Sequence, residues 1–360
     1  MVNREVDVLV VGAGPAGLTA AARLAAAGVP RVEVLERDDR AGGVPRHCAH
    51  RGFGAWPGAL TGPQYARRLT EAALRAGAEV RTGVTVLDWA GPRTLTAVSA
   101  RGPETITAGS IVLATGARER PRAARLVPGT RPAGVYTTGE LQRAVHLHGQ
   151  DIGERAVIVG ARDVAYAAAA TLRTAGTRVV AMVTEHPGPR STAVRAAHTR
   201  LWHAVPLLTD TTVTELLGHG RLSGVRVRRR NGRTTVLAAD TVVFTGDFVP
   251  DHELARRGGL TLDPATRGPA VDAALHTSRP GVFAAGGLLH PGRGARAAAH
   301  AGARAAWSVR TRQAAAEAEA VRAGQVQAEA ERGRQAQAEA GRVGRSEGEP
   351  VRVRRAAGGG

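Results

Sequence analysis

The sequence contains no lysine, a single cysteine, Cys48, and aromatic residues at only 3% of its 360 positions. One cysteine excludes an internal disulfide, a CxxC redox pair and a site in which cysteines ligate a metal or an iron–sulfur cluster. Any redox chemistry of the chain must therefore come from a cofactor or a partner. No apolar run reaches about 18 residues, so the sequence predicts no transmembrane span.

Positive charge is abundant: 49 basic residues, all of them arginine, give a formal net charge of +18. The arginines are scattered, with "RVRRR" at 226–230 and "RVRR" at 352–355 as short runs. Aromatic side chains that could stack on bases are scarce, and we therefore expect no nucleic-acid partner. The chain passes directly into an apolar strand without a signal-peptide core, and we expect a cytoplasmic location.

The opening stretch "VLVVGAGPAGLTAAA", residues 8–22, combines an apolar strand, a glycine turn and an alanine-rich helix. Its glycines, Gly12, Gly14 and Gly17, satisfy the spacing GxGxxG. The first permits a tight turn, the second lets the backbone approach a pyrophosphate, and the third lets helix and strand pack closely. Glu36 closes the second strand 19 residues past Gly17, where a carboxylate accepts hydrogen bonds from an adenosine ribose. The unit predicts a dinucleotide site with its phosphates at the helix N-terminus.

Residues 157–170, "VIVGARDVAYAAAA", repeat this unit but keep only Gly160 of the three glycines. Ala165 still allows close packing, whereas the side chain of Arg162 emerges where a pyrophosphate would approach the backbone. An arginine also pairs with phosphate in bidentate fashion, so two interpretations stand: an idle scaffold, or a lobe that binds NAD(P) in a displaced mode. Glu185, 20 residues past Ala165, is expected at the ribose position, where it would favour NAD over NADP.

The two units predict an α/β protein with two Rossmann-like nucleotide-binding lobes, the second inserted between the halves of the first. We expect a discontinuous first lobe at 1–120 and 245–312 and an inserted lobe at 121–244. Residues 313–360 consist mainly of Ala, Glu, Gln, Arg and Gly and keep no apolar stripe. This composition predicts a low-complexity tail, a frayed helix that passes into disorder.

Three motifs in order resemble flavoproteins with two dinucleotide-binding domains, the pyridine nucleotide-disulfide oxidoreductases: "LERDDRAGG" at 35–43, "IVLATGARERPR" at 111–122 and "TSRPGVFAAGG" at 277–287. The resemblance implies FAD in the first lobe, because the acid is followed by a basic residue and a Gly-Gly pair. The implied FAD-binding residues are Gly12, Gly14, Pro15, Ala16, Gly17, Glu36, Arg37, Gly42, Gly43, Val86, Ala114, Thr115, Gly116, Gly286 and Gly287. Those implied for NAD(P) in the second lobe are Gly160, Arg162 and Glu185.

A closer resemblance lies in "PRHCAHRGFG" at 45–54, "LTGPQYARR" at 60–68 and "PGTRPAGVYTTGELQRAV" at 128–145. These stretches are similar to flavoprotein subunits of sarcosine, opine and cyanide-forming amine oxidation systems, and to flavoproteins of anaerobic glycerol-3-phosphate oxidation. The resemblance implies an FAD-dependent oxidoreductase that oxidises a small amine or polyol and passes electrons to a partner subunit or carrier. The alternatives are an NAD(P)H-dependent flavin reductase without a redox disulfide, and a non-catalytic scaffold subunit.

The sequence departs from the family pattern at two places. Gly287 stands where the family carries Asp or Asn, and the lost hydrogen bond to FAD is worth about 0.5–1.5 kcal/mol, so we still expect FAD to bind. Cys48 stands alone where some family reductases carry a cysteine pair. It is the only candidate catalytic residue: its neighbours His47 and His50 could lower its pKa, or it could be a half-buried residue in a loop over the cofactor.

Overall fold

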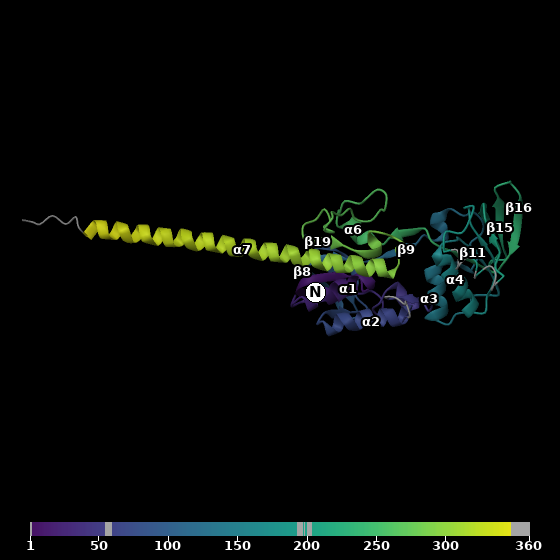
Figure 1. Ribbon diagram of the computed structural model, residues 1–360, viewed down its shortest axis with the longest axis horizontal. Coiled ribbons are helices and arrows are strands. Elements are labelled where there is room, and N and C mark those ends of the chain that lie inside the picture. Colours follow the sequence, from purple (N-terminus) through teal and green to yellow (C-terminus); the bar gives the residue numbers. More distant parts are fainter. Residues whose placement is uncertain (1, 55–59, 193–196, 198, 200–203, 347–360) are drawn as a thin grey trace, which may run out of the picture. The chain divides into compact units, whose positions relative to one another are not determined.

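The computed structural model describes residues 2–54, 60–192, 197, 199 and 204–346. Its contacts divide the chain into two units, residues 1–309 and 310–360, and each is described by itself. Two sheets of the first unit contain parallel strands, and helices pack on each of them (Figure 1). This arrangement confirms the expected α/β class with two Rossmann-like lobes.

The first sheet carries the opening glycine motif. In spatial order its strands are β5 (Glu79–Arg81), β2 (Val32–Leu35), β1 (Val2–Val11), β8 (Gly102–Leu113), β7 (Thr94–Ser99) and β6 (Thr85–Gly91), and β19 (Val282–Ala284) pairs with β8. β1 is parallel to β2 and β8, and β8 is parallel to β19, so the carboxyl ends of these strands share one edge. The apolar run at 8–11 is wholly buried, as expected of a strand covered on both faces.

Helices and short segments complete the first lobe. α1 follows the glycine turn directly, and α2 begins at a capping box in which Thr61 accepts from the Gln64 N–H and the Gln64 side chain accepts from the Thr61 N–H. These elements are α1 (Pro15–Ala26), η1 (Val44–His47), β3 (Arg51–Phe53) paired with β4 (Leu60–Thr61), α2 (Gly62–Arg75), α6 (Glu253–Arg257), η3 (Gly286–Leu288) and the start of α7 (Ala295–Ser346).

The second sheet is entirely parallel, in the order β10 (Val135–Thr137), β17 (Thr241–Phe244), β11 (Arg155–Val159), β12 (Arg178–Val183) and β13 (Leu207–Leu208). The helices of this lobe include α3 (Thr138–His146) and α4 (Asp163–Thr174), and its antiparallel sheet comprises β14 (Thr211–Leu217), β15 (Gly224–Arg229) and β16 (Thr234–Ala238). The segments that join the lobes are β9 (Ala117–Glu119), followed by η2 (Arg122–Arg125), and β18 (Phe248–Pro250). β9 and β18 pair as an antiparallel ribbon, which we call the hinge ribbon.

The second unit is helical over residues 310–346, as the continuation of α7. Its side chains are exposed from 314 to 332, and Ala, Glu, Gln and Arg favour helix without burial. The helix is thus continuous to residue 346 where the sequence predicts fraying. The last residues of the tail, 354–360, for which the sequence predicts disorder, lie outside the described residues. Of the helices that the structure describes, none is long and apolar enough to cross a membrane.

A buried ionic network links strands β1, β2, β5 and β8 of the first sheet. Arg81 donates to Glu33 at 2.7 Å and to Glu104 at 2.5 Å, and Arg4 donates to Glu33 at 2.8 Å. The two carboxylate side chains are only 1% and 7% exposed, so each needs a cation nearby to offset the cost of its burial.

We expect Arg81→Ala to lower the free energy of unfolding by about 3 kcal/mol or more, because it leaves a buried carboxylate without its cation. Urea denaturation measures the change. Arg101→Ala, at an exposed turn of the same lobe, serves as the matched control and should cost under about 0.5 kcal/mol. Equal losses in the two variants would show that the network contributes no net stability.

Candidate functional site

A cleft of 2880 Å³ collects residues of both lobes. Its walls include the glycine loop after β1, the loop from Glu36 to Gly54, the hinge ribbon and the start of α4. The cleft lies outside the carboxyl ends of β1, β8 and β19, which is where open α/β sheets bind their ligands. Its volume exceeds the roughly 300–1,000 Å³ of a pocket for one small ligand, so it has room for a dinucleotide together with a substrate.

Most residues predicted for FAD binding line this cleft, although the chain brings them from five separate segments. They are Gly12, Gly14, Pro15, Ala16, Glu36, Arg37, Gly43, Val86, Ala114, Thr115, Gly116, Gly286 and Gly287. Gly17 and Gly42 lie behind this wall. A Cβ on Gly17 would lie 1.9 Å from the carbonyl oxygen of Gly12, so Gly17 has the packing role that its place in the motif predicts.

The glycine loop leaves an open groove at the start of α1. Gly14 is the N-cap of the helix, no side chain caps it, and a Cβ built on it would meet nothing within 4 Å. Gly43 has φ +60°, and a Cβ on it would lie 2.8 Å from the Cα of Gly14. The groove is thus bounded by main chain, with the free N–H groups of a helix N-terminus at its base. These features fit the diphosphate of FAD.

The carboxylate of Glu36 is fixed beside this groove. One oxygen accepts the N–H of Ala13 at 2.9 Å and the other accepts the N–H of Asp38 at 3.1 Å. Each carboxylate oxygen has a second lone pair, so both can still accept a hydroxyl hydrogen from a ribose. The position therefore fits the adenosine ribose of FAD.

The structure has room at Gly287 for the Asp or Asn side chain that the family carries at this position. A Cβ there would make ordinary contacts of 3.5 Å with Gly116 and Ala117, and the residue does not adopt a left-handed backbone conformation. His290, three residues further on, is exposed on the cleft wall. Nothing in the local backbone therefore prevents an Asp at position 287.

Cys48 does not have the lowered pKa that its flanking histidines suggested. The thiol is buried, within 3.3 Å of Gln142 Oε1 and 3.4 Å of the Val44 carbonyl oxygen, and its pKa is raised to about 12 by burial and by the charge of Glu119. Burial, with help from Arg143 and Arg46, lowers the pKa of His47 to about 4. A neutral His47 provides no positive charge to stabilise a thiolate, so Cys48 is protonated at neutral pH.

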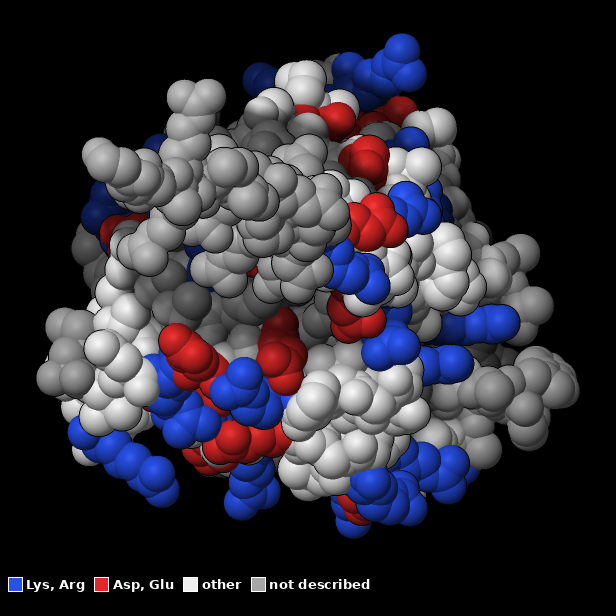
Figure 2. Space-filling view, turned by 90° about the vertical axis from the view of Figure 1, so that its left-hand side faces the viewer, with Lys and Arg blue, Asp and Glu red and all other residues white. Residues whose placement is uncertain are grey.

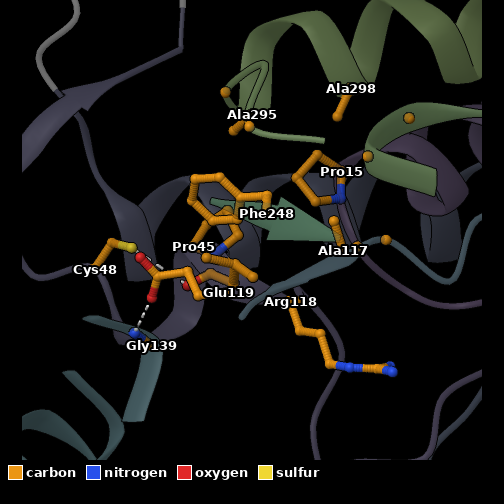
Figure 3. Close-up of a pocket in the computed structure, with 18 of the residues that line it drawn as sticks. Pro15, Pro45, Cys48, Ala117, Arg118, Glu119, Gly139, Phe248, Ala295 and Ala298 are labelled. Carbon is orange, nitrogen blue, oxygen red and sulfur yellow. Dashed lines mark hydrogen bonds between the residues drawn. The ribbon is translucent and has the colours of Figure 1, made fainter. Parts of the chain in front are cut away.

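Glu119, a residue that the sequence did not single out, lies at the centre of the cleft in Figure 3, between Cys48 and Gly139. Its carboxylate accepts the N–H of Gly139 at 3.0 Å and the N–H of Gly246 at 2.8 Å. Burial raises the pKa of this carboxyl, although the two N–H donors oppose the shift. The only signal in the sequence is its place directly after "ATGAR", at the crossing between the lobes.

The two lobes also touch away from the hinge ribbon. Arg143 of α3 donates to Asp38 at 3.2 Å, and Gln142 of the same helix meets Cys48 of the first lobe. At the end of the hinge ribbon, Asp251, the residue after β18, pairs with Arg118 at 2.5 Å and with Arg37 at 3.6 Å. The cleft is thus closed on two sides by contacts between residues far apart in the sequence.

Hydrogen bonds fix the correspondence between the two glycine loops. The Gly12 N–H donates to the Leu35 carbonyl at 2.8 Å, and the Gly160 N–H donates to the Val183 carbonyl at 2.8 Å. The residue after Val183 therefore corresponds to Glu36, and that residue is Thr184.

Glu185 was expected at the ribose position, and this correspondence places it one residue too far along the chain. Its side chain is exposed and does not line the cleft. A shift of one residue at the end of a strand turns a side chain to the opposite face, which the spacing count could not resolve. Gly160 also lies behind the cleft wall, whereas Arg162 lines it.

Charge on the face drawn in Figure 2 is mixed, with Asp and Glu side chains among the arginines. In the part of the chain that the structure describes, no group of three or more His, Cys, Asp or Glu residues could hold a metal ion.

Comparison with known proteins gives consistent matches over the first unit. The profile of the pyridine nucleotide-disulphide oxidoreductase family matches residues 6–306. Thioredoxin reductase of Mycolicibacterium smegmatis is 31% identical over 307 residues, 82% of this chain and 93% of that protein. Ferredoxin–NADP reductase of Salinispora tropica is 31% identical over 298 residues, 79% of this chain and 86% of that protein.

More distant matches include an opine oxidase subunit of Rhizobium meliloti, which is 29% identical over 312 residues. That match covers 78% of this chain but 58% of the relative, so the chain spans little more than half of that protein's length. Among solved structures, thioredoxin reductase of T. acidophilum has a TM-score of 0.74 at 24% identity, over 86% of this chain and 99% of that chain.

We expect Gly287→Asp to tighten FAD binding by about two- to twelvefold, since the added side chain fits and can restore a hydrogen bond worth about 0.5–1.5 kcal/mol. Gly14→Val should do the opposite: its side chain enters open space in the folded chain, which lets the protein fold, yet it fills the groove. Equilibrium dialysis of FAD against the stripped proteins measures both effects. Unchanged FAD affinity in Gly14→Val would show that the groove is not the diphosphate site.

We expect Cys48 to react with iodoacetamide at pH 8 roughly a thousandfold more slowly than a free cysteine, because a pKa of about 12 leaves little thiolate. Mass spectrometry of the labelled protein before and after unfolding in urea measures the difference. Labelling of the folded protein at the rate of the unfolded one would contradict the buried, protonated state.

Proposed function

Because the chain belongs to the pyridine nucleotide-disulphide oxidoreductase family and is an FAD-dependent oxidoreductase, we propose that it oxidises a small amine or polyol and passes the electrons to a partner subunit or carrier. The observation that carries the proposal is Glu119, a carboxylate of raised pKa on the cleft wall. Bound FAD supplies the acceptor for a hydride.

A dithiol relay is not available to this chain as its own chemistry. The relay needs two cysteines, and the sequence has one, whose thiol is buried and protonated. Electrons must therefore pass between FAD and another molecule without a protein disulfide as intermediate. This constraint favours a substrate that reacts at the flavin directly.

Glu119 fits the proton chemistry of an amine substrate. A small amine is an ammonium ion at neutral pH and must lose a proton before it can give up a hydride. Among the described residues no arginine forms an ion pair with Glu119, whose oxygens accept N–H groups instead. A carboxylate with a raised pKa is also a better proton acceptor than an exposed one, so Glu119 can bind the ammonium group and take its proton.

The sequence relatives support an amine and an electron partner. The opine oxidase relative is one subunit of an oxidase, which fits a protein that works with other polypeptides. The name of the Salinispora relative contains ferredoxin, a carrier. We therefore propose that a partner polypeptide or small electron carrier accepts the electrons.

We further propose that FAD is held by the cleft-lining residues of a discontinuous lobe, 1–120 and 245–312, and that 121–244 form the inserted lobe. The groove at Gly14 and Gly43 supports the diphosphate position, and Glu36 the ribose position. The reducing substrate then approaches from the side of Glu119, which Figure 3 shows across the cleft from Pro15 at the start of α1.

A second candidate is an NAD(P)H-dependent flavin reductase, which the presence of the second glycine loop on the same cleft favours. Anaerobic mixing of the FAD-loaded protein with a panel of small amines and polyols, NADH and NADPH separates the two functions. Bleaching of the flavin absorption by an amine or polyol, and not by NADH or NADPH, supports the proposal. Bleaching by a pyridine nucleotide alone overturns it.

We expect Glu119→Gln to slow flavin reduction by the active amine by about 10²–10⁴-fold, since the amide accepts no proton. The wild-type rate should rise with pH as the Glu119 carboxyl, whose pKa is raised, loses its proton, and this limb should vanish in the variant. Stopped-flow spectroscopy over a range of pH measures both effects. The Gln amide can accept only one of the two N–H groups that Glu119 accepts, so the FAD content of the variant is measured as well. An unchanged FAD content shows that the cleft is intact.

The matched control is Glu253→Gln, a carboxylate on the same cleft that already pairs with Arg118. It should leave the reduction rate within a fewfold of wild type. If Glu119→Gln reduces the flavin at the same rate as this control, Glu119 does not take part in the proton transfer.

A further inference from the structure

Equivalent hydrogen bonds allow the two glycine loops to be compared residue by residue, starting from the pair Gly12 and Gly160. One residue further on, the Ala13 carbonyl accepts the N–H of Gly42 at 2.8 Å, and the Ala161 carbonyl accepts the N–H of Arg190 at 2.8 Å. Arg190 therefore takes the place that Gly42 has in the first lobe.

The N-caps of the two helices also correspond. Gly14 precedes α1 with φ −81° and ψ −175°, and Arg162 precedes α4 with φ −90° and ψ 170°. A Cβ on Gly14 points into open space, the groove that fits a diphosphate. With the same backbone conformation, the side chain of Arg162 leaves the chain in that same direction, so it occupies the equivalent groove of the second lobe.

The course of the Arg162 side chain agrees with this comparison. Its Cδ would lie 3.8 Å from a Cβ built on Gly246, the second residue after β17. β17 is the neighbour of β11 in the sheet, so the side chain crosses the carboxyl edge of the two strands. This edge is the place where a dinucleotide crosses a Rossmann-like sheet.

The segment after β12 closes the groove from the other side. Arg190 pairs with Arg162 through a parallel bridge, and the hydroxyl of Ser191 donates to Asp163 at 2.5 Å, across the start of α4. In the first lobe this place is taken by the Gly42–Gly43 turn, which has no side chains. Thr184 stands where the first lobe has Glu36, so the second lobe also lacks the carboxylate that could accept hydrogen bonds from a ribose.

From these substitutions we infer that the second lobe does not hold NADH or NADPH in the way the first lobe fits a dinucleotide, because Arg162, with Arg190 and Ser191, fills the diphosphate groove. The inserted lobe then serves to shape the cleft and to hold Glu119 through the N–H of Gly139, while Gly246, just past the end of this lobe, donates the second N–H. The inference does not rest on the identity of the substrate.

The test compares binding of NADH and NADPH to FAD-loaded wild type, Arg162→Gly and Arg162→Gly with Arg190→Gly, by isothermal titration calorimetry. Opening the groove should tighten binding by about tenfold or more, that is about 1.4 kcal/mol, even though it removes positive charge. Arg162→Lys keeps the bulk and the charge and should bind no better than wild type. Unchanged FAD content shows that the variants are folded.

Arg228→Ala is the control for charge, since it removes an exposed arginine of the same lobe that does not line the cleft. It should not tighten binding. Weaker binding by Arg162→Gly than by wild type would overturn the inference and make Arg162 a phosphate ligand. Micromolar binding of NADH or NADPH by wild type would also overturn the inference. So would an unchanged affinity for both nucleotides in the two glycine variants.

Discussion

The main chain at Gly12 lies against the main chain at Ala114, so closely that a Cβ at Gly12 would lie 2.5 Å from the Ala114 carbonyl oxygen. This contact joins the carboxyl ends of β1 and β8, and Gly12 itself has φ +105°, which side chains rarely adopt. The turn that it permits brings the start of α1 to the edge of the sheet. Helix N-terminus, Gly43 and Glu36 then form one groove, and the rest of the cleft is arranged around it.

The second lobe shows how much of this arrangement can be kept while the groove is lost. The strand, the positive φ at Gly160 and the hydrogen bond to β12 all remain, because they form the backbone frame of the unit. The side chains of Arg162, Arg190 and Ser191 fill the groove beside this backbone frame and leave the frame itself unchanged. A folded Rossmann-like unit and an accessible diphosphate site are therefore separate properties, since the first depends on backbone contacts and the second on the absence of side chains.

The hinge ribbon gives the cleft its chemistry. It places Glu119 where it accepts one N–H from the inserted lobe, at Gly139, and one from Gly246, where the chain returns to the first lobe. It also brings Asp251 between Arg118 and Arg37. A carboxylate held in this way is buried without a cation bonded to it, and its pKa rises in consequence. The protonation of Glu119 thus depends on the way in which the two lobes are joined.

The sequence by itself determined the two strand–glycine–helix units, the class of fold, the groove glycines and the lack of a dithiol. These follow from spacing over a few residues, where backbone geometry leaves little freedom. Only the tertiary structure decided the state of Cys48, which meets Gln142 94 residues away, the part played by Glu119, and the register that puts Thr184 in place of Glu185. Burial and strand register arise from contacts between distant segments, and local spacing carries no information about them.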